Sequence, residues 1–578
     1  MKNKLIKEVT NKKTIALLMS ITIYISLCYQ DILPAYNILS FLLIGVIYYA
    51  IINTNLNISC KKEIGIISSI FSILLITGRI LYYYRYDPII NSIDEILKIQ
   101  NIVFFFGNLF LFYLILSWII PRALQYKKVS KNNDSKKIFW ITFVILAIIY
   151  SIYYIVYYPG ILSSDSISEI NMILGNELIS DHHTIFHVFW MSILFHIANL
   201  FTTDINLIIG FITLIQMFIM ILILSYSVGF FYKRNVPKWV TNSMILFYAF
   251  FSINGFYSIT IWKDIMFSCN VLLLTIECIK LLEKNKNISW KNSWTFIIVS
   301  ILTIVSRNNA FYMYILLAII TLIVLKQKRL LLFIMISIVL ICYGIIKGPI
   351  YQIYNIKISK SSEYIAIPLQ QIGRMAYKNI DFTKEEEAMI NDLIPVSVLK
   401  EVYSPEIVDP IKFNRNYHNE VFEKNKLKYL KLWTTLCIKH PSTAVEAYLT
   451  STLGYWYPGT EYWVTTAGID DNSLGIKNSS LIPQKVRMKF TEIRNNEIPI
   501  IGYLKCIGFC FWILIILLYL VVKKFKDNSW YIFVPVLGIW GTMFIATPVF
   551  SEFRYIYCAY LCLPVFFAYV FSSKKVGE

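Results

Sequence analysis

An acidic stretch, residues 158–183, holds the first residues whose types and spacing could do chemistry. It has no lysine or arginine, although the chain carries 54 basic and 35 acidic residues, and its acidic residues are Asp165, Glu169, Glu177 and Asp181. Ser166 and Glu169 have capping-box spacing and helical apolar spacing follows, which predicts a short amphipathic helix starting just after Asp165. Asp165 would lie at the positive end of that helix, suited to accept a proton or bind a cation. An ordinary capping role is the alternative.

Three of the six histidines, His182, His183 and His187, follow directly. His183 and His187 are one helical turn apart, and with Asp181 nearby they form a candidate metal pair. The spacing is not HExxH, and no second cluster of ligand residues accompanies it. For all three histidines, the favoured interpretation is hydrogen bonding to a sugar or a phosphate, or simple placement at the membrane interface.

Three cations stand at the ends of apolar runs, namely Lys263, Arg307 and Arg554. Their neighbours that could support them are Trp262, Asp264, Asn308 and Glu552. A lysine or arginine at the end of a membrane span can merely extend its charge to water. Together, however, three such cations and one acidic loop predict a site for a phosphate-linked sugar. Asp165 is also a candidate ligand for a divalent cation such as Mg or Mn.

The elements that must position these residues are membrane spans. The chain has 578 residues, of which 57% are hydrophobic and 15% charged, and a mean hydropathy of +0.59. Soluble proteins carry about 25% charged residues, and a span needs about 20 apolar residues. We predict an all-α polytopic membrane protein with about fourteen spans, at residues 14–30, 37–53, 64–84, 101–120, 138–157, 205–231, 239–257, 264–282, 293–306, 309–325, 330–346, 499–522, 529–547 and 555–571.

Two segments decide the topology. Counting 184–200 as a span would place Lys233, Arg234 and Lys238 outside, against the positive-inside rule, so we predict a helix that lies at the interface or re-enters from the outside. As a single helix, 293–325 would be about 50 Å long with Arg307 in its middle. A hairpin with Arg307, Asn308 and Asn309 at its outer tip fits better.

This topology predicts cytoplasmic termini and four regions. They are a four-span extension (1–137), a transmembrane core (138–346) whose catalytic outer loop is 158–183, an extracytoplasmic domain (347–498) and a three-span bundle (499–578). The basic residues cluster between apolar runs, so the net charge of +19 reflects membrane topology and not nucleic-acid binding. The basic N-terminal segment is interpreted as leading into an uncleaved first span. Most of the ten cysteines lie in apolar runs, and Cys437 alone gives the extracytoplasmic domain no disulfide.

The layout resembles the GT-C superfamily of polytopic glycosyltransferases, such as protein O-mannosyltransferases and lipid A aminoarabinose transferases. The matching features are the acidic first outer loop with Asp165, the non-spanning helices beside it and Asp264 in the next outer loop. The YPG, DS, DHH and WKD segments within 138–282 are also similar to those of uncharacterised bacterial membrane proteins with a GT-C-like layout. Further similar fragments are EYIAIPLQQIGR (363–374) and SEFRY (551–555). Related transferases often carry His-Pro-Pro where this chain has His-His-Thr, and the WWDYG-type motif of oligosaccharyltransferases is absent.

The resemblance implies transfer of a sugar from polyprenyl phosphate to a cell-envelope acceptor at the outer face of the membrane. Asp165 would be the general base, and Lys263, Arg307 and Arg554 would bind the donor phosphate. Asp264 would orient Lys263 or help to hold a divalent cation. Three alternatives stay open: a lipid-linked polysaccharide polymerase or ligase, a transporter or flippase of lipid-linked saccharides, and a membrane protein without catalysis.

Overall fold

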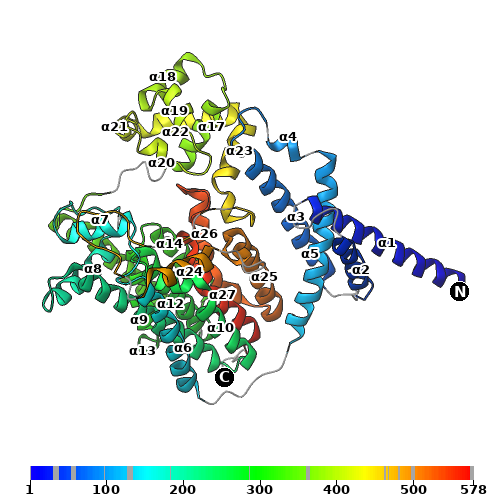
Figure 1. Ribbon diagram of the computed structural model, residues 1–578, viewed down its shortest axis with the longest axis horizontal. Helices are drawn as coiled ribbons and strands as arrows, with labels where there is room; N and C mark the ends of the chain where they lie inside the picture. Colours follow the sequence, from blue (N-terminus) through cyan, green and yellow to red (C-terminus); the bar gives the residue numbers. More distant parts are fainter. Residues whose placement is uncertain are drawn as a thin grey trace.

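The computed structural model describes residues 2–29, 38–53, 60–90, 92–96, 98–126, 134–182, 184–284, 287–358, 365–460, 462, 464–465, 468–479, 482–495 and 502–572. Within these residues the fold is helical, with isolated β-bridges and no strand (Figure 1). Nine helices in this part of the chain are long and apolar enough to cross a membrane. The predicted class, an all-helical polytopic membrane protein, is therefore confirmed.

Each predicted span overlaps one or more helices, although several boundaries differ. The nine long ones are Lys61–Tyr84 (α3), Ile99–Gln125 (α5), Ser135–Val156 (α6), Ile205–Tyr232 (α9), Lys263–Glu283 (α12), Arg329–Ile353 (α15 to α16), Ile507–Phe525 (α25), Asn528–Ile545 (η6 and α26) and Phe553–Phe571 (α27). The other predicted spans overlap α1 (Lys2–Tyr29), α2 (Ile38–Asn53), α10 (Lys238–Phe250) with α11 (Ser252–Ser258), α13 (Trp290–Ser306) and α14 (Ala310–Val324).

Helices α6 and α9 run in opposite directions. The Tyr154 hydroxyl near the end of α6 donates to the Gly210 carbonyl near the start of α9, at 2.8 Å. At the other end, Ser135 of α6 lies against Gly229 of α9. Helix α8 (Ile185–Asn199), which lies between them in sequence, thus starts and finishes at one end of the bundle. This confirms the prediction from the charge distribution that residues 184–200 do not run from one end of the bundle to the other. The depth of α8 in a membrane stays a prediction.

The segment 293–325 is a hairpin, as predicted. Helix α13 ends at Ser306 and α14 begins at Ala310. The Asn309 amide beside the turn donates to the Thr542 hydroxyl at 3.0 Å, whereas Thr321 near the other end of α14 bonds to Tyr531 at 2.8 Å. Arg307 in the turn pairs with Asp264 at the start of α12, and Ile161 just after α6 pairs with Thr260 just before α12. The turn therefore lies at the end of the bundle where α6 ends and α12 begins, which we call the site end.

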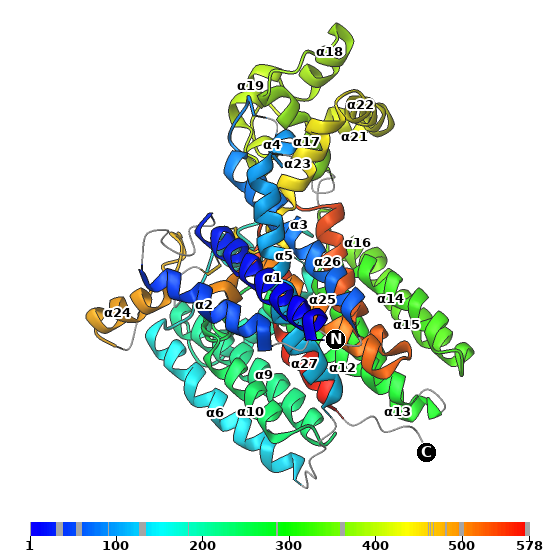
Figure 2. The ribbon, with the colours of Figure 1, turned by 90° about the vertical axis from the view of Figure 1, so that its right-hand side faces the viewer.

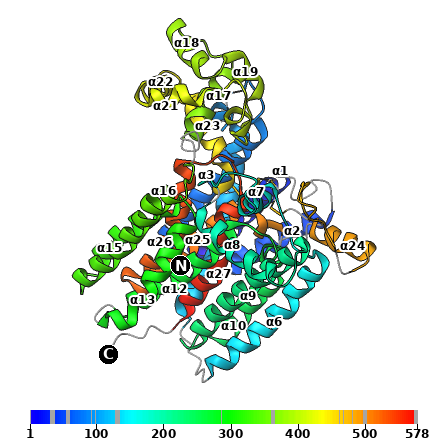
Figure 3. The ribbon, with the colours of Figure 1, turned by 90° about the vertical axis from the view of Figure 1, so that its left-hand side faces the viewer.

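A small helical domain covers the site end of the bundle (Figures 1, 2 and 3). Its helices are α17 (Ala366–Tyr377), α18 (Lys384–Leu393), α19 (Val396–Val402), α20 (Asp409–Lys412), α21 (Asn419–Lys424), α22 (Lys426–Lys439) and α23 (Pro441–Ser451). These helices enclose an apolar core of their own, which includes Leu369, Met375 and Leu436. The remaining helices are α4 (Ser92–Ile96), α7 (Ser164–Ile173) and α24 (Gln484–Asn495).

A buried ion-pair cluster within this domain connects it to the N-terminal helices. The Glu446 carboxylate, which is 1% exposed, receives Arg374 and Lys378 at 2.6 Å each. Arg374 also donates to the Arg85 carbonyl just beyond α3 at 2.7 Å, and the Arg85 side chain pairs with Glu406 at 2.7 Å. The domain is therefore fixed over the bundle at a defined position.

Gly508 in α25 is predicted to tolerate no side chain. A Cβ atom there would overlap the backbone of Tyr457, whereas a Cβ at Gly541 in α26 would meet nothing within 4 Å. Overpacking typically costs about 1–3 kcal/mol, so Gly508→Ala should lower the melting temperature of the detergent-solubilised protein. Gly541→Ala, the matched control, should be neutral or stabilising, because alanine favours helix over glycine by about 1 kcal/mol. Equal melting temperatures of Gly508→Ala and Gly541→Ala would contradict the close contact between Gly508 and Tyr457.

Candidate active site

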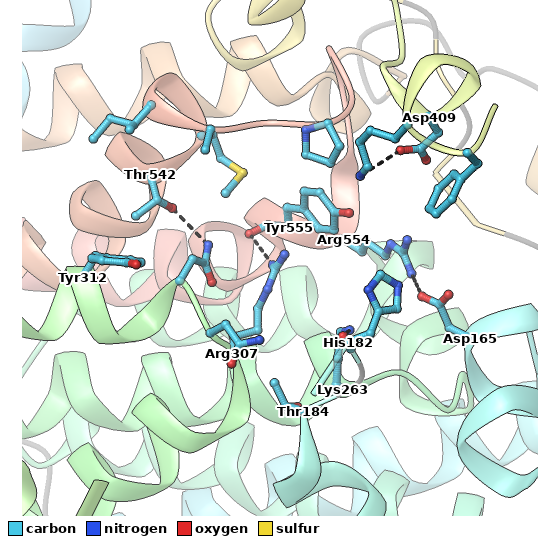
Figure 4. Close-up of a pocket in the computed structure, with 18 residues that line it drawn as sticks. Asp165, His182, Thr184, Lys263, Arg307, Tyr312, Asp409, Thr542, Arg554 and Tyr555 are labelled. Carbon is cyan, nitrogen blue, oxygen red and sulfur yellow. Dashed lines mark hydrogen bonds and ion pairs between the residues drawn. The ribbon is translucent and has the colours of Figure 1, made fainter. Parts of the chain in front are cut away.

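A cavity of about 610 Å³ lies between the site end of the bundle and the small domain (Figure 4). Its walls come from the start of α7, the segment before α8, the start of α12, the α13–α14 turn, α20, the end of α26 and the start of α27. The charged side chains that line it are Asp165, Lys263, Arg307, Asp409, Lys412 and Arg554. The predicted base and the three predicted phosphate ligands therefore meet in one cavity.

Helix α7 presents Asp165 to this cavity in its first turn. The helix begins at Ser164, because Ser163 caps it in a capping box with Ser166. The predicted start after Asp165, with Ser166 and Glu169 as the box, is wrong by two residues. Ser166 accepts the Ser163 N–H at 3.2 Å, and Glu169 turns into the interior. The expectation that Asp165 lies at the positive end of a short helix is confirmed.

The start of α7 is held against the start of α12. The Trp262 indole N–H donates to the Ser163 hydroxyl at 2.6 Å, and the Ser166 hydroxyl donates to the Ile261 carbonyl at 2.6 Å. The Arg554 guanidinium lies over the Trp262 ring, 5.2 Å from its centroid. Trp262 thus connects the acidic loop with the cation that faces it.

Arg554 connects Asp165 with Glu552. Its Nη1 donates to Asp165 Oδ2 at 2.6 Å, and its Nε lies 3.4 Å from Glu552 Oε1. The Asp165 side chain is 31% exposed, whereas that of Glu552 is 3% exposed. A substrate in the cavity can therefore reach Asp165 but not Glu552.

Asp264 orients a different cation from the one predicted. Its carboxylate is 1% exposed and pairs with Arg307 Nη1 at 2.9 Å. Lys263 instead donates to the His182 carbonyl at 2.9 Å. Lys263 and Asp264 are the first two residues of α12, and their side chains point in different directions. Adjacency in sequence therefore did not identify the cation that pairs with Asp264. Asp264 supports Arg307 from behind, and Lys263 helps to shape the 182–184 segment.

Asp181 anchors the acidic loop and does not line the cavity. Its carboxylate receives Lys347 at 2.7 Å and the Tyr351 hydroxyl at 2.7 Å. Asn308 donates to the Asp181 carbonyl at 3.1 Å and accepts from Lys347 at 2.8 Å. The predicted boundary of the extracytoplasmic domain at Lys347 lies within a helical stretch that continues to Ile353. Asp181 therefore fixes the loop to the α13–α14 turn.

The histidines separate in the structure. His182 lines the cavity, and His183 lies outside the described residues. His187 Nδ1 pairs with Glu169 Oε2 at 2.6 Å, and both side chains are 2% exposed. In the part of the chain that the structure describes, no group of three or more His, Cys, Asp or Glu residues is placed to hold a metal ion. The candidate metal ligands Asp165 and Asp264 each pair with an arginine.

Sequence reasoning missed the part of the cavity that the small domain supplies. Asp409, Lys412 and Phe413 line it from α20 and its end, and Asp409 lies 3.3 Å from Lys412. Tyr312 and Tyr555 complete the aromatic walls. The spacing of Asp409 and Lys412 does not distinguish them from an ion pair on the surface of a helix. Their place in the cavity depends on contacts with bundle residues more than a hundred positions away in sequence, which local spacing does not reveal.

Glu552, just before α27, titrates near neutral pH. Burial raises the pKa of its carboxyl to about 7, Arg554 opposes this rise, and Asp264 adds to it. The folded protein therefore holds this proton more tightly than the unfolded chain, whose glutamate pKa is 4.5. The contribution of Glu552 to the stability of the folded protein is complete below pH 4.5 and is lost as the pH rises through about 7.

We predict that Glu552→Gln removes this pH dependence. Glutamine cannot titrate, so the melting temperature of the variant should fall less than that of the wild type as the pH rises from about 5 to about 8. Thermal unfolding of both proteins in one detergent, buffered across this range, measures the difference. Parallel curves for the two proteins would show that Glu552 is not the group responsible.

A protein-family model described as "Family of unknown function (DUF6020)" matches residues 175–577. The matched region is more than half of the chain and contains Lys263, Arg307, Lys412 and Arg554, whereas Asp165 lies before it. No curated protein matches the chain, and no solved structure does.

Proposed function

The chain belongs to the family of unknown function DUF6020, and we propose that it is a membrane glycosyltransferase of the GT-C superfamily. It transfers a sugar from a polyprenyl-phosphate donor to a cell-envelope acceptor. In this proposal fourteen helices cross the membrane, both termini are cytoplasmic, and the cavity opens at the outer face.

The observation that carries the proposal is the convergence of Asp165 with an excess of cations. Lys263, Arg307, Lys412 and Arg554 line the cavity against Asp165 and Asp409, and the buried Asp264 lies behind Arg307. Among the residues that the structure describes, four positive charges therefore face three negative ones, besides Glu552, which titrates near neutral pH. An unbalanced positive charge in a partly enclosed space favours an anionic ligand. Asp165 is the exposed carboxylate beside it, which suits a base acting next to a bound phosphate.

The apolar part of the cavity supports a lipid-linked donor. Tyr312 and Ile545 line it and are 58% and 76% exposed, on helices α14 and α26. Met543 and Ala546 continue this wall. A water-soluble sugar phosphate has no apolar chain to bury against this surface, whereas contact with it stabilises a bound isoprenoid chain.

The reaction uses these groups in one displacement. Asp165 takes the proton of an acceptor hydroxyl, whose oxygen attacks the anomeric carbon of the donor sugar. The bond from that carbon to the phosphate oxygen breaks, and its electron pair leaves with polyprenyl phosphate. The configuration at the carbon inverts. Lys263, Arg307 and Arg554 neutralise the charge that develops on the phosphate, so no dedicated acid is needed. Asp165 would help to hold a divalent cation, which would supply further positive charge to the leaving phosphate.

The alternatives require other features. A transporter places its ionisable groups near the middle of the membrane, whereas the paired charges here lie at the site end of the bundle. A polymerase or ligase would use a diphosphate-linked oligosaccharide in the same kind of cavity. An experiment must therefore distinguish a monophosphate-linked sugar donor from a diphosphate-linked oligosaccharide donor.

Lipid extracts of a strain lacking the protein test the proposal. A transferase predicts accumulation of a polyprenyl monophosphate that carries one sugar, together with loss of that sugar from the envelope. Accumulation of a diphosphate-linked oligosaccharide would instead identify a polymerase or ligase. Accumulation of the monophosphate carrier at the inner face alone would identify transport and reject the transferase.

A further inference from the structure

A second charged cavity, of about 570 Å³, lies at the opposite end of the bundle from the candidate active site. It is formed where α6 begins and where α9 and α12 end. Helices α6 and α9 lie side by side in Figures 2 and 3. Its basic residues are Lys136, Lys233, Arg234, Lys280 and Lys284, and its aromatic walls are Phe139, Trp140, Tyr226 and Phe230. The transfer reaction uses none of them.

Two of these five cations are already neutralised. Arg234 forms a two-point ion pair with Glu283, at 2.9 and 2.5 Å, and its guanidinium lies 3.4 Å from the centroid of the Phe230 ring. Lys280 pairs with Glu277 at 2.6 Å, and Glu277 also accepts from the Thr295 hydroxyl. These pairs account for both acidic side chains that approach the cavity from α12.

The other three lysines, Lys136, Lys233 and Lys284, remain available to a ligand. All three are exposed, and among the residues that the structure describes no carboxylate lies within ion-pair distance of them. The positive-inside rule explains why basic residues occur at this end of the bundle. It does not explain why lysines at the ends of three different helices line one cavity with aromatic walls.

We propose that this cavity binds the phosphate head group of an anionic membrane lipid. Lysines at a membrane surface attract such head groups, and aromatic side chains are common at that level of the bilayer. An apolar strip leads away from the cavity along α6, formed by Trp140, Val144 and Ile148, which are 58%, 51% and 62% exposed. The strip suits acyl chains, and it distinguishes a lipid from a free phosphate ion. The proposal is independent of the transfer reaction.

The close approach of α6 and α9 builds the cavity floor. A Cβ atom at Gly229 would lie 3.4 Å from the Ser135 carbonyl oxygen and 3.5 Å from Phe139 Cβ. This contact brings Lys136 on α6 close to Lys233 at the end of α9. The lysines therefore converge because the two helices pack tightly, and not because they are near in sequence.

Native mass spectrometry of the full-length protein in an uncharged detergent tests the proposal, with phosphatidylglycerol and phosphatidylcholine as probes. The wild type should bind phosphatidylglycerol more tightly than phosphatidylcholine. The combined change Lys136→Gln, Lys233→Gln and Lys284→Gln should lower the phosphatidylglycerol affinity by about 100-fold, the expected effect of three lysines at a membrane surface. The matched control is Lys62→Gln, Lys326→Gln and Lys328→Gln, three exposed lysines outside the cavity, and it should keep the preference.

Three results would overturn the proposal. They are equal affinity of the wild type for both lipids, unchanged phosphatidylglycerol affinity in the cavity variant, and displacement of the lipid by a large excess of inorganic phosphate. The last would identify a site for free phosphate. Lys284→Glu, which alters one exposed side chain, provides a second variant and should weaken phosphatidylglycerol binding in the same direction.

Discussion

Replacing Asp165 with asparagine is expected to lower the rate of sugar transfer by about 10²- to 10⁴-fold, the usual contribution of a positioned general base. Asparagine keeps the size of the side chain and can still contact Arg554, but it cannot take the acceptor proton. Membrane vesicles containing the wild type or Asp165→Asn, supplied with donor lipid extracted from the deletion strain, measure this rate. The amounts of both proteins in the membrane must be equal.

Asp409→Asn is the matched control for this prediction. Asp409 also lines the cavity, but it is held by Lys412 on the small domain and lies on another wall from Arg554. The proposed reaction gives it no proton to accept, so transfer should stay within a few-fold of the wild type. A large loss with Asp409→Asn, and none with Asp165→Asn, would assign the base to the small domain.

Replacing Arg554 with glutamine is expected to lower transfer by about 10²- to 10³-fold, as removal of one group that stabilises transition-state charge does elsewhere. The guanidinium is the side chain that contacts both Asp165 and Glu552, and it lines the cavity where the phosphate would bind. Its loss removes a charge from the phosphate site and also releases Asp165. The same vesicle assay measures the effect on the rate and on the donor concentration required.

Two further variants separate charge from geometry at this position. Arg554→Lys keeps the positive charge but loses the planar fork that reaches two carboxylates, so it should recover only part of the activity. Arg329→Gln removes an arginine at the opposite end of the bundle, where α15 begins, and should leave transfer unchanged. Full activity of Arg554→Gln would remove Arg554 from the phosphate site.

The helical framework could be predicted from the sequence because membrane spans depend on local composition. Runs such as 205–231 and 555–571 are apolar for long enough to cross a bilayer, and each corresponds to one helix. The charge distribution also predicted that α8 does not run across the bundle between α6 and α9. Such predictions succeed because hydrophobicity and charge bias act segment by segment.

The pairing of charges could not be predicted in the same way. Asp264 supports Arg307 and not the adjacent Lys263, and Asp181 binds Lys347, which lies 166 positions later. Lys412 reaches the cavity only because the small domain folds over the site end of the bundle. Local patterns select residues capable of chemistry, but their partners depend on the three-dimensional packing of distant segments.

The most direct test of the central claim is the sugar composition of the envelope in a deletion strain that carries either the wild type or Asp165→Asn at equal membrane levels. The account predicts that one sugar disappears on deletion, returns with the wild type and does not return with Asp165→Asn. Equal restoration by Asp165→Asn would contradict it, because the acidic loop would then not be the catalytic site.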